Sequence, residues 1–280
     1  MKSLTTILIL GCGALTGYAQ TTTSPKSVTV AQGEVARWAG NCLRCSFEKR
    51  VWPTVNGTCY YPVDMDMKAG TYTISRRTTG GKLEAAKLTV TEKPCVQEDI
   101  KNFPKQEYVT VSASNQARAV KEAAVVNPLI SYRETVKPAV FDLPVGKPAS
   151  PLPKGEGNFG ACRTLNGQPR DRHTGQDYPV GAGSSVMSVG NGRVVLAANQ
   201  FYSGNSVFID HGNGLVTEYF HLKSYTVKPN QTVTKGQKIG EAGETGRVTG
   251  PHLHFGVRWH GACINPGYLL IDPSDMQAVK

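Results

Sequence analysis

The sequence predicts a mainly β protein: a small immunoglobulin-like sandwich, a connector with one short helix, and a compact antiparallel β domain. Short alternating stretches separated by turn residues recur in residues 27–95. Similar stretches, divided by glycine-rich turns, return in residues 154–280. Only the segment between them, residues 96–153, contains a pattern typical of a helix.

The first 19 residues are predicted to be a secretory signal peptide. Lys2 supplies a positive start, residues 4–15 an apolar run, and residues 17–19 (Gly-Tyr-Ala) a small-x-small cleavage site. The run is shorter than the roughly 20 apolar residues that a membrane span needs. We therefore expect export to the periplasm or the medium, with no stable membrane insertion after cleavage. A cut before Cys12, which would give a lipid-anchored protein, is the less favoured alternative.

Residues 27–95 have the pattern of a small β-sandwich. Residues 28–30 alternate, residues 70–74 resemble a strand after a turn, and Gly80-Gly81 precedes another strand at residues 88–90. These residues contain no catalytic constellation. The expected roles of this unit are binding, spacing or steric control of the second unit.

The connector, residues 96–153, is predicted to hold a helix over residues 114–126, with Ser112 or Ser114 as its cap. Prolines then give an extended, semi-rigid strip that can lie along a neighbouring domain. They are Pro138, Pro144, Pro148, Pro151 and Pro153.

Residues 154–280 are predicted to be a β domain with little helix. Asn191-Gly192 precedes a strand, residues 205–209 run into a Gly-Asn-Gly turn, and residues 215–221 return from it. Asn-Gly pairs favour hairpins because both turn residues need positive φ.

Six cysteines follow the predicted signal peptide, and an even count in an exported chain predicts disulfides. We expect pairing within each region, with Cys162 bonded to Cys263. The four earlier cysteines can pair in three ways, and a zinc site starting at the CxxC motif is a weak alternative. The four are Cys42, Cys45, Cys59 and Cys95.

The chain is basic, with 31 Lys and Arg against 21 Asp and Glu and a formal net charge of +10. Such a balance attracts polyanions. Because the cations are scattered and no nucleic-acid motif accompanies them, we expect no nucleic-acid partner. We expect the target to be an anionic polymer outside the cell.

Five of the six histidines lie between residues 173 and 254. His173 and Asp177 are four residues apart, and His252 and His254 face the same side of a strand because side chains alternate. His221 ends an alternating stretch that can direct it to the same place. Each of these three patterns is weak evidence alone, but their occurrence one after another within about eighty residues indicates a metal site.

Three protein ligands and one open position are what catalytic zinc requires. Zinc lowers the pKa of bound water to about 7 and polarises a carbonyl. Two further histidines beside three ligands can act as a base and stabilise an oxyanion. The sequence therefore predicts hydrolysis that depends on a single zinc ion.

Residues 159–257 resemble the lysostaphin-type zinc endopeptidases, which cut peptide bonds of peptidoglycan. The spacing of His173 and Asp177 separates the chain from the D-alanyl-D-alanine peptidase relatives. The upstream part is similar, more weakly, to the β domain and linker that precede some of these enzymes. The matching motifs are Phe159-Gly160 with Arg163, Asn166-Gly167, His173-x-Gly175-x-Asp177, Asp210-His211-Gly212, Tyr219-x-His221-Leu222, Lys235-Gly236-Gln237 and, most specific, residues 249–255 (TGPHLHF).

The resemblance implies that His173, Asp177 and His254 bind zinc. It implies that His221 and His252 are catalytic, one as general base and the other stabilising the oxyanion or orienting water. The implied fold is a compact β domain with a narrow groove, acting on peptidoglycan as a monomer. The loop at residues 165–172 lacks the tyrosine of some relatives. Either Tyr178 or Tyr202 compensates for it, or the histidines suffice without a tyrosine. We expect a structural role for His211 and exposure for His260.

Two other functions share these features. Relatives that regulate or bind other wall hydrolases without catalysis lack at least one of the five positions, whereas this chain keeps all five. A toxin aimed at competing bacteria, or a protease of ordinary proteins, would use the same chemistry on another target. The residues do not choose between a D-alanyl link to a diamino acid and a glycine bridge.

Overall fold

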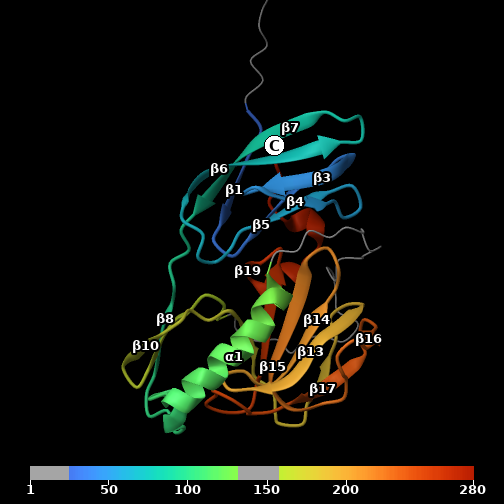
Figure 1. The fold of residues 1–280 in the computed structure, drawn as a ribbon. Helices are drawn as coiled ribbons and strands as arrows, with labels where there is room; N and C mark the ends of the chain where they lie inside the picture. The colour runs from blue at the N-terminus through green and yellow to red at the C-terminus, as the bar shows by residue number, and fades with distance from the viewer. Residues whose placement is uncertain (1–24, 132–157) are drawn as a thin grey trace, which may run out of the picture.

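The computed structural model describes residues 25–131 and 158–280 (Figure 1). The predicted signal peptide and the predicted proline-rich strip lie outside the described residues. The described part is mainly β, with a single α-helix, which confirms the predicted fold class. No helix in this part is long and apolar enough to cross a membrane.

The N-terminal unit contains a five-stranded sheet and a two-stranded ribbon that together enclose a core. Trp52, Tyr61, Ile74 and Leu88 are among the buried side chains of this core. The sheet has the order β1-β7-β6-β3-β4, and the ribbon pairs β2 with β5. The strands are β1 (Ser27–Ala31), β2 (Val35–Trp38), β3 (Cys42–Phe47), β4 (Arg50–Pro53), β5 (Cys59–Pro62), β6 (Gly70–Thr78) and β7 (Leu83–Thr91).

The ribbon joins the two units because its alternating side chains face two cores. Ala36 and Tyr61 pack in the N-terminal core, whereas Val35 and Tyr60 belong to the C-terminal core. Tyr60 stacks on Trp259 with ring centroids 5.3 Å apart. The two units therefore share packing across the ribbon.

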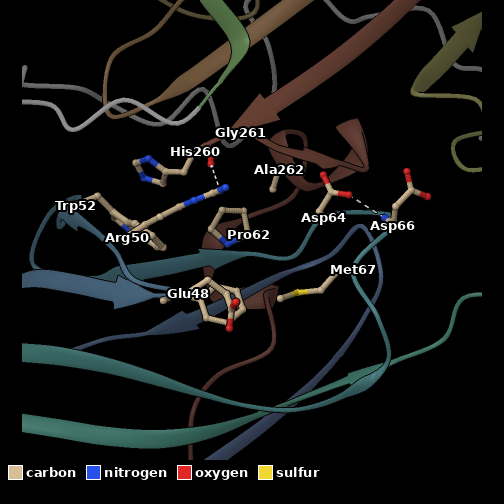
Figure 2. Close-up of a pocket in the computed structure, with 11 residues that line it drawn as sticks. Glu48, Arg50, Trp52, Pro62, Asp64, Asp66, Met67, His260, Gly261 and Ala262 are labelled. Atoms are coloured by element: carbon tan, nitrogen blue, oxygen red, sulfur yellow. Dashed lines mark hydrogen bonds between the residues drawn. The ribbon is translucent and has the colours of Figure 1, made fainter. Parts of the chain in front are cut away.

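A cavity of about 310 Å³ lies at this junction (Figure 2). His260 stacks on Trp52 with ring centroids 4.3 Å apart, and Arg50 Nη1 donates to the His260 carbonyl oxygen at 3.0 Å. Only 2% of His260 is exposed, so the prediction of an exposed side chain is wrong. Contact between the two units buries this histidine, and no local pattern marks such contact.

The last residues of the chain pair with the N-terminal unit. Lys280 exchanges backbone hydrogen bonds with Ser27, and Arg37 does so with Gln277 and Val279. Val279 packs against the N-terminal core. The C-terminal segment thus ties the second unit back to the first.

The C-terminal unit is built on a nine-stranded sheet with the central order β11-β18-β15-β14-β13-β16. Its core includes Tyr219, Leu222, Phe255 and Trp259, all fully buried. The strands are β11 (Gly175–Tyr178), β12 (Ser185–Met187), β13 (Gly192–Gln200), β14 (Gly204–Asp210), β15 (Leu215–Tyr225), β16 (Thr232–Val233), β17 (Lys238–Ala242), β18 (Leu253–Trp259) and β19 (Ala262–Ile264). Short 3₁₀ helices follow at Pro266–Leu269 and Pro273–Asp275.

The connector adds one strand to a small sheet of the C-terminal unit and then forms a helix across that unit (Figure 1). Strand β8 (Gln97–Ile100) runs parallel to β9 (Cys162–Leu165), which pairs with β10 (Gln168–Arg170). A 3₁₀ turn (Gln106–Tyr108) precedes α1 (Ala113–Ile130).

Helix α1 confirms the predicted helix and is longer than expected. Ser112 Oγ accepts the Asn115 backbone N–H and caps the helix. Arg118 donates to Asn199 at 2.9 Å, and Glu122 accepts the Phe201 backbone N–H at 2.7 Å. These contacts with β13 and the turn after it stabilise the helix in place of a buried apolar face, because α1 has no buried residue.

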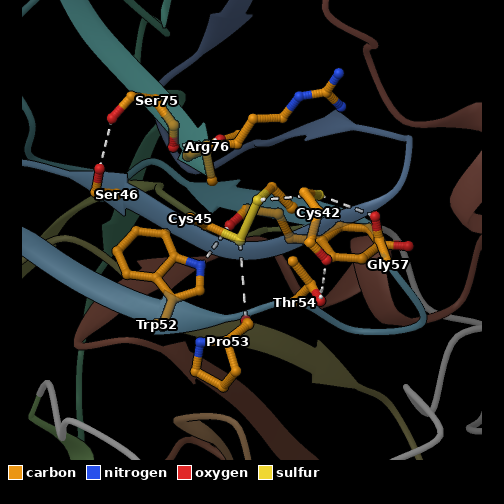
Figure 3. Close-up of a disulfide and its surroundings, with 12 residues drawn as sticks. Cys42, Cys45, Ser46, Trp52, Pro53, Thr54, Gly57, Ser75 and Arg76 are labelled. Atoms are coloured by element: carbon orange, nitrogen blue, oxygen red, sulfur yellow. Dashed lines mark hydrogen bonds between the residues drawn. A yellow bond between two sulfur atoms is a disulfide. The ribbon is translucent and has the colours of Figure 1, made fainter. Parts of the chain in front are cut away.

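One of the two disulfides among the described residues agrees with the predicted pairing within each region, and the other does not. Cys45 is bonded to Cys59 (Figure 3), which excludes a zinc site at the CxxC motif, and Cys42 is a buried thiol. Cys95 is bonded to Cys162, so the predicted Cys162–Cys263 bond is wrong. The parallel pairing of β8 with β9 brings residues 95 and 162 together.

Cys263 lies instead on β19 and is buried as a free thiol. Its Sγ donates to the Thr174 carbonyl oxygen at 3.2 Å. The predicted rule of pairing within each region therefore holds for Cys45 and Cys59 and is wrong for Cys95.

Candidate metal centre

The structure brings His173, Asp177 and His254 together on one side of the C-terminal sheet. His173 Nε2 lies 2.8 Å from His254 Nδ1 and 3.1 Å from Asp177 Oδ1, and His254 Nδ1 lies 3.0 Å from the same oxygen. The antiparallel register of β11 and β18 places Asp177 directly opposite His254. The pairing of these two short strands therefore brings Asp177 and His254, which are 77 positions apart in the sequence, into contact.

These three side chains fit a divalent cation. His173 Nδ1 lies 3.0 Å from the Asn158 carbonyl oxygen, which only accepts, so Nδ1 carries the proton and Nε2 presents its lone pair to the centre. The ligand atoms lie within 4.8 Å of one another, close enough for one ion at about 2.0–2.2 Å from each. His254 is buried, and burial lowers its pKa, which disfavours the charged form of this ring.

Asp177 is held by a second layer of polar groups. Its Oδ2 accepts from Asn158 Nδ2 and from Arg163 Nη2, each at 3.0 Å. Arg163 in turn pairs with Glu98 of β8. Burial opposes ionisation of Asp177, but its close contacts with the His173 and His254 rings outweigh burial and hold the pKa of the carboxyl far below its usual range.

Sequence reasoning missed Asn158 and Glu98 as parts of this layer. Arg163 belongs to a matching motif, but that motif does not indicate its contact with Asp177. Asn158 precedes the Phe159-Gly160 motif, so that motif could have directed attention to it. Glu98 comes from the connector, and only the pairing of β8 with β9 reveals its position.

His221 and His252 lie beside the three candidate ligands. Their ring centroids are 4.9 Å apart, and His252 Nε2 is 3.6 Å from Asp177 Oδ1. His221 Nδ1 faces the Thr245 carbonyl oxygen at 2.9 Å, and His252 Nδ1 faces that of Gly250 at 2.9 Å. In both rings Nδ1 therefore donates, which leaves the lone pair of a neutral ring on Nε2.

His221 is adapted to stay neutral. Burial, and next the nearby charges of His254 and His252, lower its pKa well below the usual value. Its backbone has φ +63°, an uncommon value for a residue other than glycine. A neutral, buried imidazole in a constrained backbone is suited to accept a proton in the groove.

The two tyrosines named from the sequence have different surroundings. Tyr202 lines a cavity with His173 and His221. Tyr178 is buried in the core, where burial raises its pKa to about 12, and it lines neither cavity beside the candidate centre. Of these two tyrosines, Tyr202 is therefore the one that faces the groove. His211 is buried between Asn191 and Thr217, as expected of a structural residue.

A groove passes the candidate centre as two adjoining cavities of about 500 and 790 Å³. Four side chains line both cavities: Arg163, Arg170, His221 and Arg247. Asp177 and His252 face one cavity, and His173 and His254 face the other. An extended chain lying in the groove would pass all five predicted site residues.

A compact β domain with a His, Asp and His cluster beside two further histidines is the arrangement of a metallohydrolase. Residues 171–266 match the model of Peptidase family M23, so this part of the chain is an M23 metallopeptidase domain. This is the lysostaphin-type family that the motifs predicted.

Curated relatives resemble the chain over this domain. Peptidoglycan DD-endopeptidase ShyA from Vibrio cholerae is 46% identical over 93 residues, which cover 33% of this chain and 22% of the relative. DD-carboxypeptidase/endopeptidase Mpg from Neisseria meningitidis is 39% identical over 94 residues, covering 34% of this chain and 22% of the relative. The matched part thus spans about a fifth of these relatives.

A solved structure resembles a larger part of the chain. The crystal structure of a candidate M23 peptidase from Pseudomonas aeruginosa aligns with 86% of this chain and 94% of its own, with a TM-score of 0.60. Sequence identity is 24%, so the likeness describes the fold alone. The N-terminal β unit and connector are therefore part of a known arrangement.

Proposed function

We propose that this protein is an exported zinc endopeptidase that hydrolyses peptide bonds in peptidoglycan stems or cross-links. The observation that carries the proposal is the convergence of His173, Asp177 and His254 beside His221 and His252. The names of the relatives, peptidoglycan DD-endopeptidases, support the target. All five positions are present and lie together, which favours an enzyme over a non-catalytic regulator.

His173, Asp177 and His254 would hold the zinc ion. When bound, zinc lowers the pKa of a water molecule and polarises the scissile carbonyl. Asn158 and Arg163 orient the Asp177 carboxylate, and the Asn158 carbonyl fixes the His173 tautomer.

His221 and His252 would share the proton transfer and the stabilisation of the oxyanion. Each ring is oriented by a backbone carbonyl at Nδ1, so Nε2 is the atom that can accept a proton. The lowered pKa of His221 keeps its ring neutral, so its Nε2 lone pair is available to the substrate or to water.

The test uses the purified mature protein, intact sacculi and mass spectrometry of the released fragments. Asp177→Ala and His254→Ala should lose zinc and lysis together. His252→Ala should keep zinc and lose most turnover, and His211→Asn, outside the groove, serves as the matched control. Lysis by a metal-free His254→Ala protein, or intact sacculi after treatment with the zinc-loaded wild type, contradicts the proposal.

A further inference from the structure

Two arginines in the groove have no acidic partner among the described residues. Arg170 donates to the Val109 carbonyl oxygen at 2.8 Å and to the Gln168 side chain at 3.1 Å. Arg247 lies over the Tyr202 ring, 4.9 Å from its centroid. By contrast, Arg163 next to them forms ion pairs with Glu98 and Asp177.

The positive charges of these arginines act on each other. Burial is the largest cause that lowers the pKa of Arg247; Tyr202 opposes it, and the charges of Arg170 and Arg163 lower the pKa further. Asp171 offsets this effect in part, but it is exposed and forms no ion pair with either guanidinium in the described part of the chain. Half-buried cations without a counterion are costly, and a bound anion would relieve that cost.

Arg247 has a fixed position relative to the candidate centre. Its backbone N–H donates to the Tyr202 carbonyl oxygen at 2.9 Å. Two residues earlier, the Thr245 carbonyl oxygen accepts from His221 Nδ1. Lys105 Nζ donates to the carbonyl oxygens of Glu244 and Gly246 at 3.0 Å each. The loop that carries Arg247 is thus held by the connector and by a predicted catalytic residue.

We propose that Arg170 and Arg247 form a carboxylate-binding subsite, so that the enzyme prefers wall peptides with a free carboxylate beside the scissile bond. This inference rests on the proposed function and narrows its substrate. A planar guanidinium fork binds a carboxylate through two parallel hydrogen bonds. Both arginines line both cavities, so a carboxylate near the metal can reach them.

The proposed subsite discriminates between the two candidate substrates, a D-alanyl link to a diamino acid and a glycine bridge. A D-alanyl bond to a dicarboxylic diamino acid leaves a free carboxylate next to the scissile bond. A glycine bridge carries no side-chain charge and would leave both guanidinium groups without an anion. The groove therefore favours the first kind of cross-link.

The test compares two synthetic cross-linked peptides joined by a D-alanyl–diaminopimelate bond. One has the carboxylate beside the bond free, and the other has it amidated. The zinc-loaded wild type should cleave the free acid with a kcat/KM roughly 10–100 times that of the amide, the usual effect of losing charge-assisted hydrogen bonds. Arg247→Gln and Arg170→Gln should each lower kcat/KM for the acid and reduce that ratio, with little change for the amide.

The matched control is Lys228→Gln, which removes one positive charge at an exposed position that lines neither cavity. It should leave the ratio unchanged. Equal cleavage of both peptides by the wild type overturns the subsite while keeping the proposed function, and this result does not depend on whether a variant folds. An equal loss on both peptides in the arginine variants also overturns it. Failure of the wild type to cleave either peptide or sacculi overturns the proposed function itself.

Discussion

Asn158 holds Asp177 through both ends of its carboxamide. The amide oxygen accepts the Asp177 backbone N–H at 3.0 Å, and Nδ2 donates to Oδ2 at 3.0 Å. The Asn158 backbone carbonyl also lies 3.0 Å from His173 Nδ1. One residue therefore orients two of the three candidate ligands.

Replacing this side chain should weaken metal binding without removing a ligand. Asn158→Ala loses both hydrogen bonds to Asp177, and outer-layer partners of metal ligands typically contribute about 10–100-fold in affinity. Competition with a chromogenic chelator measures the change. Asn199→Ala, an exposed amide bonded to Arg118 and Asn205, is the control and should retain wild-type zinc affinity. Equal affinities of the two variants would refute the role of Asn158.

The sequence was sufficient to predict which side chains meet at the centre. The spacing of His252 and His254 predicts side chains on the same side of the chain, although β18 itself begins at Leu253. His173 and Asp177 are only four residues apart. The contacts that the sequence could not predict are those that depend on pairing between distant segments. Glu98 reaches Arg163, and Cys95 reaches Cys162, only because β8 runs parallel to β9.

The same reason explains the error at His260. A period-two pattern indicates which face of a strand is buried, but contact between two folded units leaves no periodic signal. His260 is buried by Trp52 of the other unit. The proximity of Arg170 and Arg247 to the same groove could likewise not be predicted from the sequence, because the two residues lie far apart in the chain.

Gly175 is required because the His254 ring approaches its backbone. A Cβ at this position would lie 2.5 Å from His254 Nε2 and 2.6 Å from the Phe255 carbonyl oxygen. Gly175→Ala should displace His254, with a loss of about 100-fold in kcat/KM, as expected for a shift of about 1 Å in a catalytic group. In Gly181→Ala the nearest atom is 4.0 Å away, so kcat/KM should be unchanged. Zinc content and wall lysis of both variants, measured together, test this, and wild-type activity of Gly175→Ala contradicts it.

The Cys95–Cys162 disulfide connects the connector to the layer around Asp177. It joins residues 67 positions apart, one position before Arg163. Replacing both cysteines with serine should lower the free energy of unfolding by about 2–4 kcal/mol. Because β8 carries Glu98, kcat/KM should fall as well.

The Cys45–Cys59 disulfide provides a matched comparison, since it lies in the N-terminal unit. Its double serine variant should lose stability and keep the kcat/KM of its folded fraction. Chemical denaturation and peptide hydrolysis separate the two effects. If both double variants keep wild-type kcat/KM, the disulfide at residues 95 and 162 has no part in the site.

Acid should destabilise the folded protein through two buried histidines. Burial lowers the pKa of His211 to about 4 and of His260 to about 3, where the charge of Arg50 adds to the effect. The unfolded chain, with a histidine pKa near 6.5, binds more protons than the folded chain between these values and 6.5. The free energy of unfolding therefore rises with pH in this window, and the contribution is lost as the pH falls below about 6.5.

His260→Asn isolates one of these contributions, because asparagine tolerates the backbone φ of +48° at this position. Between about pH 7 and about pH 5, the wild type should lose roughly 2 kcal/mol more than the variant, given about 1.4 kcal/mol per pKa unit. Urea unfolding at the two pH values measures the difference. An identical loss in both proteins would mean that His260 is protonated without cost. Because the His260 ring stacks on Trp52, we expect its protonation to weaken the contact between the two units.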